Sequence, residues 1–339
     1  MRGGISVFLS GIILAATLSG CVTTGTQGGG GYSGEPVTSP SAAQYEINKG
    51  KAFATKNEVA IGGFKVAFVT KIRGSNSTRG SFLGGGSPGK AAATAVLSGL
   101  SQEVMQQITD AAYEDFKTKL IARGYRVRPF ATIRNHPGFT AINTKGSPLE
   151  TSEPMPAMSA DALIFAPTGQ KLRLFASQGA GLQGFGWSSP ESGFSKVAVE
   201  TGIPLLDVYY VVNFASFGGH SSRTTTSISV DQSMSVVNGS QLYITSGYGG
   251  TFSSDQGSIR LKQPIGSERK FASITEEEKS GTEQLGNVLA KGVAALLGGG
   301  TRASSTYDFV TNADDYRKAA LDALAKTSEG VTTQMAALR

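Results

Sequence analysis

Cysteine is nearly absent from this chain, because Cys21 is the only one among 339 residues. A single thiol cannot form a disulfide within its own chain, so packing and hydrogen bonds must hold the fold together. The sequence has only two histidines, His136 and His220, and both stand in loop-like stretches. A zinc site needs three or four closely spaced ligands. We therefore expect neither a disulfide scaffold nor a metal site.

Charge and long apolar runs are also scarce. Charged residues make up 17% of the chain, and 31 basic against 25 acidic residues leave a formal net charge of +6. The basic residues gather into no more than pairs such as Arg269-Lys270, so we expect no nucleic-acid partner. No apolar run inside the chain reaches the roughly 20 residues of a membrane-spanning helix. The 45 glycines are typical of a protein rich in strands and loops.

A glycine-rich stretch at residues 83–92, LGGGSPGKAA, imitates two catalytic motifs. It matches G-x-x-x-x-G-K, a phosphate-binding loop, and G-x-S-x-G, the turn around a nucleophilic serine at Ser87. Both motifs rely on a backbone N–H at the position of Pro88, and proline has none. We therefore interpret the stretch as a loop. No other group of residues forms a catalytic pattern, so we predict no catalytic residue, no cofactor and no enzymatic activity.

The N-terminal residues have the pattern of a signal peptide. Arg2 precedes an apolar run from Ile5 to Leu18, which has the length of the apolar part of a secretion signal. The run ends in Leu18-Ser19-Gly20-Cys21, which resembles the lipobox of bacterial lipoproteins. The resemblance implies cleavage before Cys21 and attachment of fatty acyl chains such as palmitate to this residue. Because Val22 follows the cysteine, it also implies anchoring in the outer membrane.

These features divide the chain into four parts. Residues 22–44 are rich in Gly, Ser, Thr and Pro and have almost nothing apolar to bury, which is typical of a flexible tether. Further glycine-rich inserts are expected at 71–100 and 177–193. In chain order we predict a signal peptide, a lipidated tether, a single periplasmic α/β domain and a tail: 1–20, 21–54, 55–330 and 331–339.

The first half of the predicted domain has a β–α–β pattern. Residues 60–70 alternate like a strand. Residues 90–100 are expected to begin a helix, and residues 101–123 carry apolar side chains four positions apart up to Gly124. Residues 125–130 then resemble a second strand. Such a run predicts two parallel strands in one sheet.

Antiparallel hairpins and a C-terminal helix are predicted for the second half, which makes the expected fold α+β or α/β with a mixed sheet. Asn238-Gly239 is a strong hairpin-turn signal that we expect to join the strands on either side. Helices are predicted over 274–297 and after Asn312, where Asp315 stands at the capping-box spacing. The predicted strands are 161–166, 172–176, 194–200, 205–217, 227–237 and 240–248.

An aromatic loop stands out near the middle of the chain. It contains Phe185, Trp187 and Phe194, and Trp187 is the only tryptophan. Aromatic side chains at a loop tip favour a contact with a membrane interface or with another subunit. A local cluster folded onto its own domain explains the same pattern.

The order of the elements is similar to that of the curli-secretion channel lipoproteins, over roughly residues 55–330. Both have a lipidated cysteine, a flexible anchor, a strand like AIGGFKVAFVT, an insert, a helix, a strand after ADALI and a terminal helix. The resemblance implies an α/β periplasmic domain that assembles into rings. We therefore expect an outer-membrane lipoprotein with a structural, assembly or secretion-related role, and with copies of itself or other envelope proteins as partners. An anchored envelope enzyme and a small-ligand binding module remain the alternatives.

Overall fold

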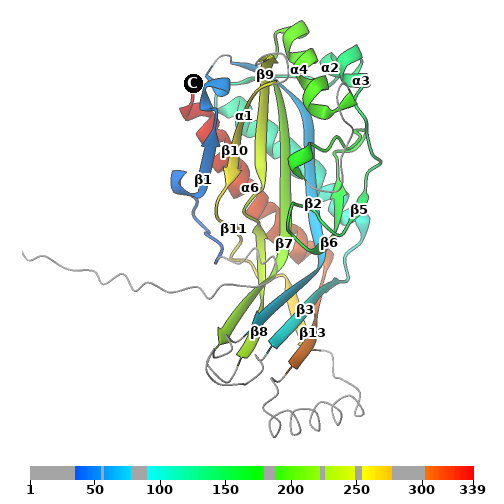
Figure 1. The fold of residues 1–339 in the computed structure, drawn as a ribbon, viewed down its shortest axis with the longest axis vertical. Helices are drawn as coiled ribbons and strands as arrows, with labels where there is room; N and C mark the ends of the chain where they lie inside the picture. The colour runs from blue at the N-terminus through cyan, green and yellow to red at the C-terminus, as the bar shows by residue number, and fades with distance from the viewer. Residues whose placement is uncertain are drawn as a thin grey trace, which may run out of the picture.

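The fold is a mixed α+β fold, as predicted, built on one 13-stranded sheet (Figure 1). Two long helices, α1 (Gln102–Ala122) and α6 (Ala313–Ala337), pack against each other along the sheet. Among the described helices, none combines the length and the apolar character that crossing a bilayer takes. The computed structural model describes residues 35–54, 57–77, 90–178, 188–221, 226–248, 254–276 and 302–339.

The centre of the sheet is a parallel pair, β2 (Glu58–Ser77) and β7 (Leu205–Ser221), in which Phe64 lies opposite Val208. On one side of this pair the sheet continues antiparallel through β9 (Gln241–Tyr248), β10 (Ser254–Leu261) and β1 (Tyr45–Asn48). On the other side it continues through β6 (Ala160–Phe165) and β5 (Leu149–Thr151). In this part, which we call the body, β1 and β5 therefore lie at edges on opposite sides of the central pair.

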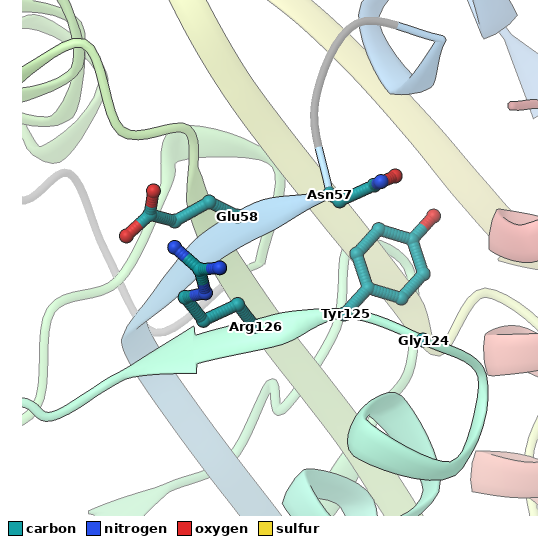
Figure 2. Close-up of a pocket in the computed structure, with 5 residues that line it drawn as sticks. All are labelled: Asn57, Glu58, Gly124, Tyr125 and Arg126. Atoms are coloured by element: carbon teal, nitrogen blue, oxygen red, sulfur yellow. The ribbon is translucent and has the colours of Figure 1, made fainter.

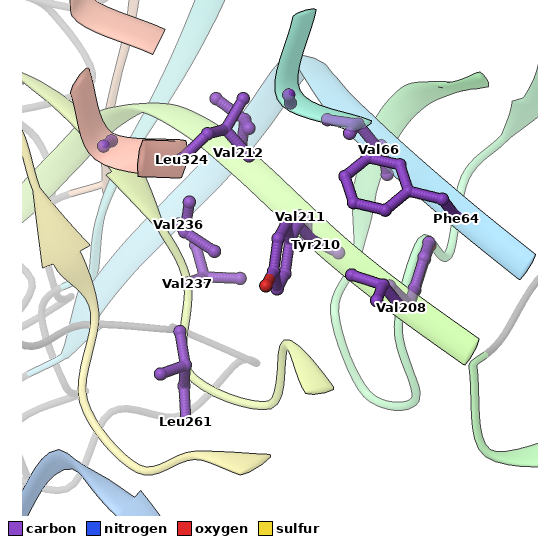
Figure 3. Packing of buried hydrophobic residues seen from close by; sticks show 14 of the residues in the cluster. Phe64, Val66, Val208, Tyr210, Val211, Val212, Val236, Val237, Leu261 and Leu324 are labelled. Atoms are coloured by element: carbon purple, nitrogen blue, oxygen red, sulfur yellow. The ribbon is translucent and has the colours of Figure 1, made fainter. Parts of the chain in front are cut away.

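Every second side chain along the central strands faces the long helices, and these side chains build the core between the sheet and the helices. Phe64 contacts the rings of Tyr113 and Phe116 of α1 and of Tyr210 of β7, with centroids 5.6 to 5.9 Å apart. Figure 3 shows part of this core, with side chains from β2, β7 and α6. The fully buried residues of α1 include those spaced four apart in the sequence, which is why its apolar pattern predicted the helix correctly.

Beyond the body, further paired strands extend past the helices at one end of the molecule (Figure 1). The second halves of β2 and β7 pair with β3 (Lys90–Ser98) and β8 (Thr226–Val236), and β12 (Ala272–Glu276) pairs with β13 (Arg302–Thr311). β13 also runs parallel to β3. We call these extensions the projecting end: residues 71–77, 90–98, 215–221, 226–233, 272–276 and 302–310.

Several sequence predictions are confirmed. β4 (Arg126–Arg128) lies parallel to the start of β2, as the β–α–β pattern predicted. The predicted strands at 161–166, 205–217 and 227–237 correspond to β6, β7 and β8. At the start of α6, the Asn312 side chain accepts a hydrogen bond of 2.9 Å from the Asp315 backbone N–H. The shorter elements are η1 (Ala42–Gln44), η2 (Gly50–Phe53), α2 (Ala131–Arg134), α3 (Pro137–Thr140), η3 (Ala176–Gln178) and β11 (Ile265–Gly266).

Two predicted elements have the wrong secondary structure. Residues 90–98 form strand β3 between β2 and β13 rather than a helix, because pairing on both sides outweighs the helix preference of alanine. Residues 194–200 belong to helix α4 (Pro190–Thr201), which is capped by Ser189 and ends at Gly202 with a φ of 68°. The expected strand at 172–176 is reduced to a single bridge between Lys145 and Leu172.

The Asn238-Gly239 turn is present, but it does not close a hairpin. Gly239 has a φ of +89°, yet β8 and β9 do not pair with each other. Both pair with β7, which is long enough to hold β9 along its first half and β8 along its second half. The prediction of helix over 274–297 is wrong for 274–276, which lie in β12, and its remainder falls outside the described residues.

Packing starts before residue 55 and continues beyond residue 330. β1 lies within the predicted tether, where Tyr45 and Phe53 are buried. Helix α6 continues through the predicted tail to Ala337, and Val331 and Met335 are buried. These few apolar residues are enough to dock both segments onto the body.

Candidate functional site

An ion pair links the two central strands inside the body. Lys65 of β2 and Asp207 of β7 are 1% and 0% exposed, and the Lys65 ammonium pairs with Oδ1 of Asp207. Lys65 also donates to the backbone oxygen of Arg173 over 2.8 Å, and Gln178 Nε2 donates to Oδ2 of Asp207 over 2.6 Å. The network therefore ties the segment 173–178 to the face of the sheet opposite α1.

Burial shapes the charge state of this pair. Desolvation lowers the pKa of Lys65 and raises the pKa of Asp207, while the attraction between the two charges opposes both shifts. On one side the sheet packs closely against the pair, because a Cβ at Gly63 would overlap the Asp207 carboxylate. Both charged groups have protein partners, and neither cavity described below reaches them. We therefore assign the pair a structural role.

The sequence carries a signal for this pair, although its local patterns alone do not predict the contact. Lys65 stands in the apolar stretch FKVAFV, and Asp207 stands in LLDVYYVV. A single charged residue inside each of two apolar strands is costly to bury unless the two meet. Opposite signs in such positions can therefore point to a contact between the strands.

A second apolar cluster beneath α2, α3 and α4 contains one of the predicted contact residues. Phe194 is 0% exposed, and its ring lies 5.8 Å from that of Phe139 and 5.3 Å from that of Phe175. Arg173 covers the cluster, with its guanidinium 3.9 Å from the Phe139 centroid, and burial lowers its pKa to about 10. Phe194 is thus unavailable for a membrane or subunit contact, because α4 turns it inward. Phe185 and Trp187 lie outside the described residues.

An open depression of about 560 Å³ lies where α1 ends, between β2 and β4 (Figure 2). Figure 2 shows the side chains of Glu58 and Arg126 on one side and those of Asn57 and Tyr125 on the other, so they do not converge on one point. Tyr125 is also engaged elsewhere, because its hydroxyl donates to the backbone oxygen of Met335 over 3.0 Å. This arrangement does not resemble a catalytic site.

A second depression, of about 510 Å³, lies along β5, β6 and the neighbouring part of β2. Glu150 and Asp161 contribute exposed carboxylates, while the other lining groups are mostly hydroxyls and small apolar side chains. Such a surface favours a basic group over an anion. We call it the acidic groove, and it is lined by Thr70, Glu150, Thr151, Ser152, Asp161, Ala162 and Leu163.

The remaining sequence candidates do not come together. His136 is not a free loop side chain, because its Nδ1 accepts from the Gly138 N–H over 3.1 Å and its Nε2 lies 3.1 Å from Glu200. His220 lies in β7 rather than in a loop. Among the residues that the structure describes, no group of three His, Cys, Asp or Glu side chains could hold a metal ion. Cys21 and the lipobox lie outside the described residues.

Comparison with known proteins adds no family assignment. No protein-family model, no curated protein and no solved structure matches this chain. Its function must therefore be inferred from its own residues and fold.

Proposed function

We propose that this protein is an outer-membrane lipoprotein, anchored through acyl chains on Cys21, with a structural, assembly or secretion-related role. Its body assembles with further copies of itself, as in a ring, or docks onto another envelope assembly. The lipobox supports the anchor, because each buried CH₂ of an acyl chain contributes about 0.8 kcal/mol and two or more chains give a stable attachment.

The observation that carries the assembly proposal is the set of free strand edges. Within the described residues, β1 pairs only with β10, and β5 pairs only with β6. At the projecting end, β12 likewise pairs only with β13, and the first part of β8 pairs only with β7. A free edge presents a row of unpaired N–H and C=O groups, which is a template for another chain.

Side chains of the projecting end support the same proposal. Its strands are dominated by serine, threonine, alanine and glycine, which leave their backbones accessible. Ile274 of β12 and Val310 of β13 are nevertheless 38% and 46% exposed. Burying such apolar area against another copy would contribute roughly 25 cal/mol per Å². We therefore propose that these strands meet a partner in the assembled protein.

Lipidation is tested by comparing the full-length protein with Cys21→Ser. We expect the wild-type protein to fractionate with the outer membrane and to show, by mass spectrometry, an acylated Cys21 at its mature N-terminus. The variant should lose the acyl mass and leave the membrane fraction. A wild-type protein with an intact Met1 and a bare thiol would rule out the anchor.

Assembly is tested on the detergent-extracted wild-type protein. We expect mass photometry and electron microscopy to show multiples of the subunit, with discrete sizes if the assembly closes into a ring. Cross-linking in intact cells should give the same multiples. Only monomers in both experiments would contradict self-assembly.

A further inference from the structure

The two edges of the body carry opposite charges. On one edge, β1 and the adjoining turns present exposed cations; on the other, the acidic groove lies beside β5. Figure 1 shows β1 and β5 at opposite sides of the body. We call the first surface the basic edge, and its cations are Lys49, Lys51, Arg260 and Lys262.

The charges on both surfaces are only partly compensated. None of the four cations of the basic edge forms an ion pair with another described residue, and neither does Glu150 nor Asp161. Each surface contains one residue of the opposite sign. Glu46 lies across from Arg260 in the β1–β10 pairing, and Lys71 lies across from Asp161 in the β2–β6 pairing. The basic edge therefore keeps a net positive charge, and the acidic groove keeps a net negative charge.

The side chains of the basic edge also suit the shape of the acidic groove. The basic edge presents Ile47, which is 38% exposed, followed by Lys49 and Lys51. The groove offers about 510 Å³ of open space, with Glu150, Asp161 and the partly buried Leu163 among its lining residues. A lysine carries an apolar stem and a charged tip, so it suits a groove that offers both an apolar side chain, Leu163, and carboxylates.

We propose that the acidic groove of one copy receives the basic edge of the next copy, so that β1 adds to the sheet beside β5. This contact depends on the proposed self-assembly and names the two surfaces that make it. Because the surfaces lie on opposite edges of one sheet, the contact is head-to-tail, and each copy leaves one surface free for another copy. Backbone pairing of the two edges supplies affinity, and the charges fix orientation and speed of association.

Charge reversal in full-length, detergent-extracted protein tests the contact. The groove variant combines Glu150→Lys with Asp161→Lys, and the edge variant combines Lys49→Glu with Lys51→Glu. Each variant alone juxtaposes like charges, so we expect at least a tenfold rise in the protein concentration that gives half-assembly. Mixed one to one, the variants present complementary surfaces at every contact, and assembly should return with the two variants alternating.

The matched control combines Lys270→Glu with Lys318→Glu, which changes the net charge as the edge variant does. Both lysines are exposed and form no ion pair with a described residue, so the control should assemble like the wild type. Recovery on mixing also shows that the variants are folded.

Three results would overturn the inference. If the wild type assembles and either charge-reversed variant does so equally well, these surfaces are not in contact, although self-assembly stands. If the variants fail singly and mixing does not restore assembly, the surfaces bind something other than each other. If the wild type is monomeric in detergent and in cells, self-assembly itself fails, and the contact with it.

Discussion

The body and the projecting end are built from the same central strands, yet their residues differ sharply. Within the body, β2 carries Phe64, Val66 and Phe68, all of which are fully buried. Past residue 72 the same strand reads RGSNS, and β7 likewise changes from LLDVYYVV to a stretch with two glycines. One half of each strand therefore stabilises the fold, while the other half supplies exposed backbone edges. A single strand can serve both purposes because stability depends on burial and not on strand length.

The largest expected effect comes from leaving one charge of the buried pair without its partner. Lys65→Met should cost about 3–5 kcal/mol of unfolding free energy, because Asp207 stays buried and unpaired. The double variant Lys65→Met with Asp207→Leu should recover most of this loss. Chemical denaturation of the purified protein measures both. A single-variant loss below 1 kcal/mol would show that the pair is not desolvated as the structure indicates.

A smaller effect on stability is expected where α6 packs against β1. A Cβ at Gly330 would overlap the buried hydroxyl end of Tyr45, so Gly330→Ala should cost about 1–3 kcal/mol. The control is Gly247→Ala, because nothing lies within 4 Å of a Cβ at that position. Equal thermal stabilities of the two variants would mean that Tyr45 moves aside without cost.

Alkaline pH should lower the free energy of unfolding by an amount comparable to, or smaller than, the loss expected for Gly330→Ala. Burial raises the pKa of Tyr316 above its ordinary value of 10.0. A group whose pKa is raised by folding contributes its full stabilisation at pH values below its pKa in the unfolded chain. For this tyrosine the contribution therefore falls as the pH rises above 10. The slope is about 1.4 kcal/mol per pH unit for one tyrosine. Tyr316→Phe should lessen the loss between pH 10 and 11, and an unchanged slope would contradict this account.

The smallest effect is expected at the projecting end. Ser229→Ala in β8 and Ser304→Ala in β13 remove exposed hydroxyls, so each should change the unfolding free energy by less than about 0.5 kcal/mol. Denaturation curves would then overlay that of the wild type. A loss above 1.5 kcal/mol would show that this end contributes to stability as the body does, and the comparison between the two regions would fail.

Local patterns predicted some elements well and others badly. The helix at 101–123 was predictable because its apolar residues recur at helical spacing along one face. The alanines of β3 and the aromatic Phe194 of α4 were misassigned, because short apolar runs fit a strand and a helix equally well. Neighbouring strands and packing partners, which the local sequence does not specify, decided these cases.

The sequence by itself determined the features that depend on adjacent residues: the long amphipathic helix and the Asn312 cap. Only the tertiary structure decided which strands pair. It brought Lys65 to Asp207 across 142 residues and placed the basic edge and the acidic groove at opposite sides of one sheet. The physical reason is that strand register and order are set by contacts between distant segments, which no local period encodes.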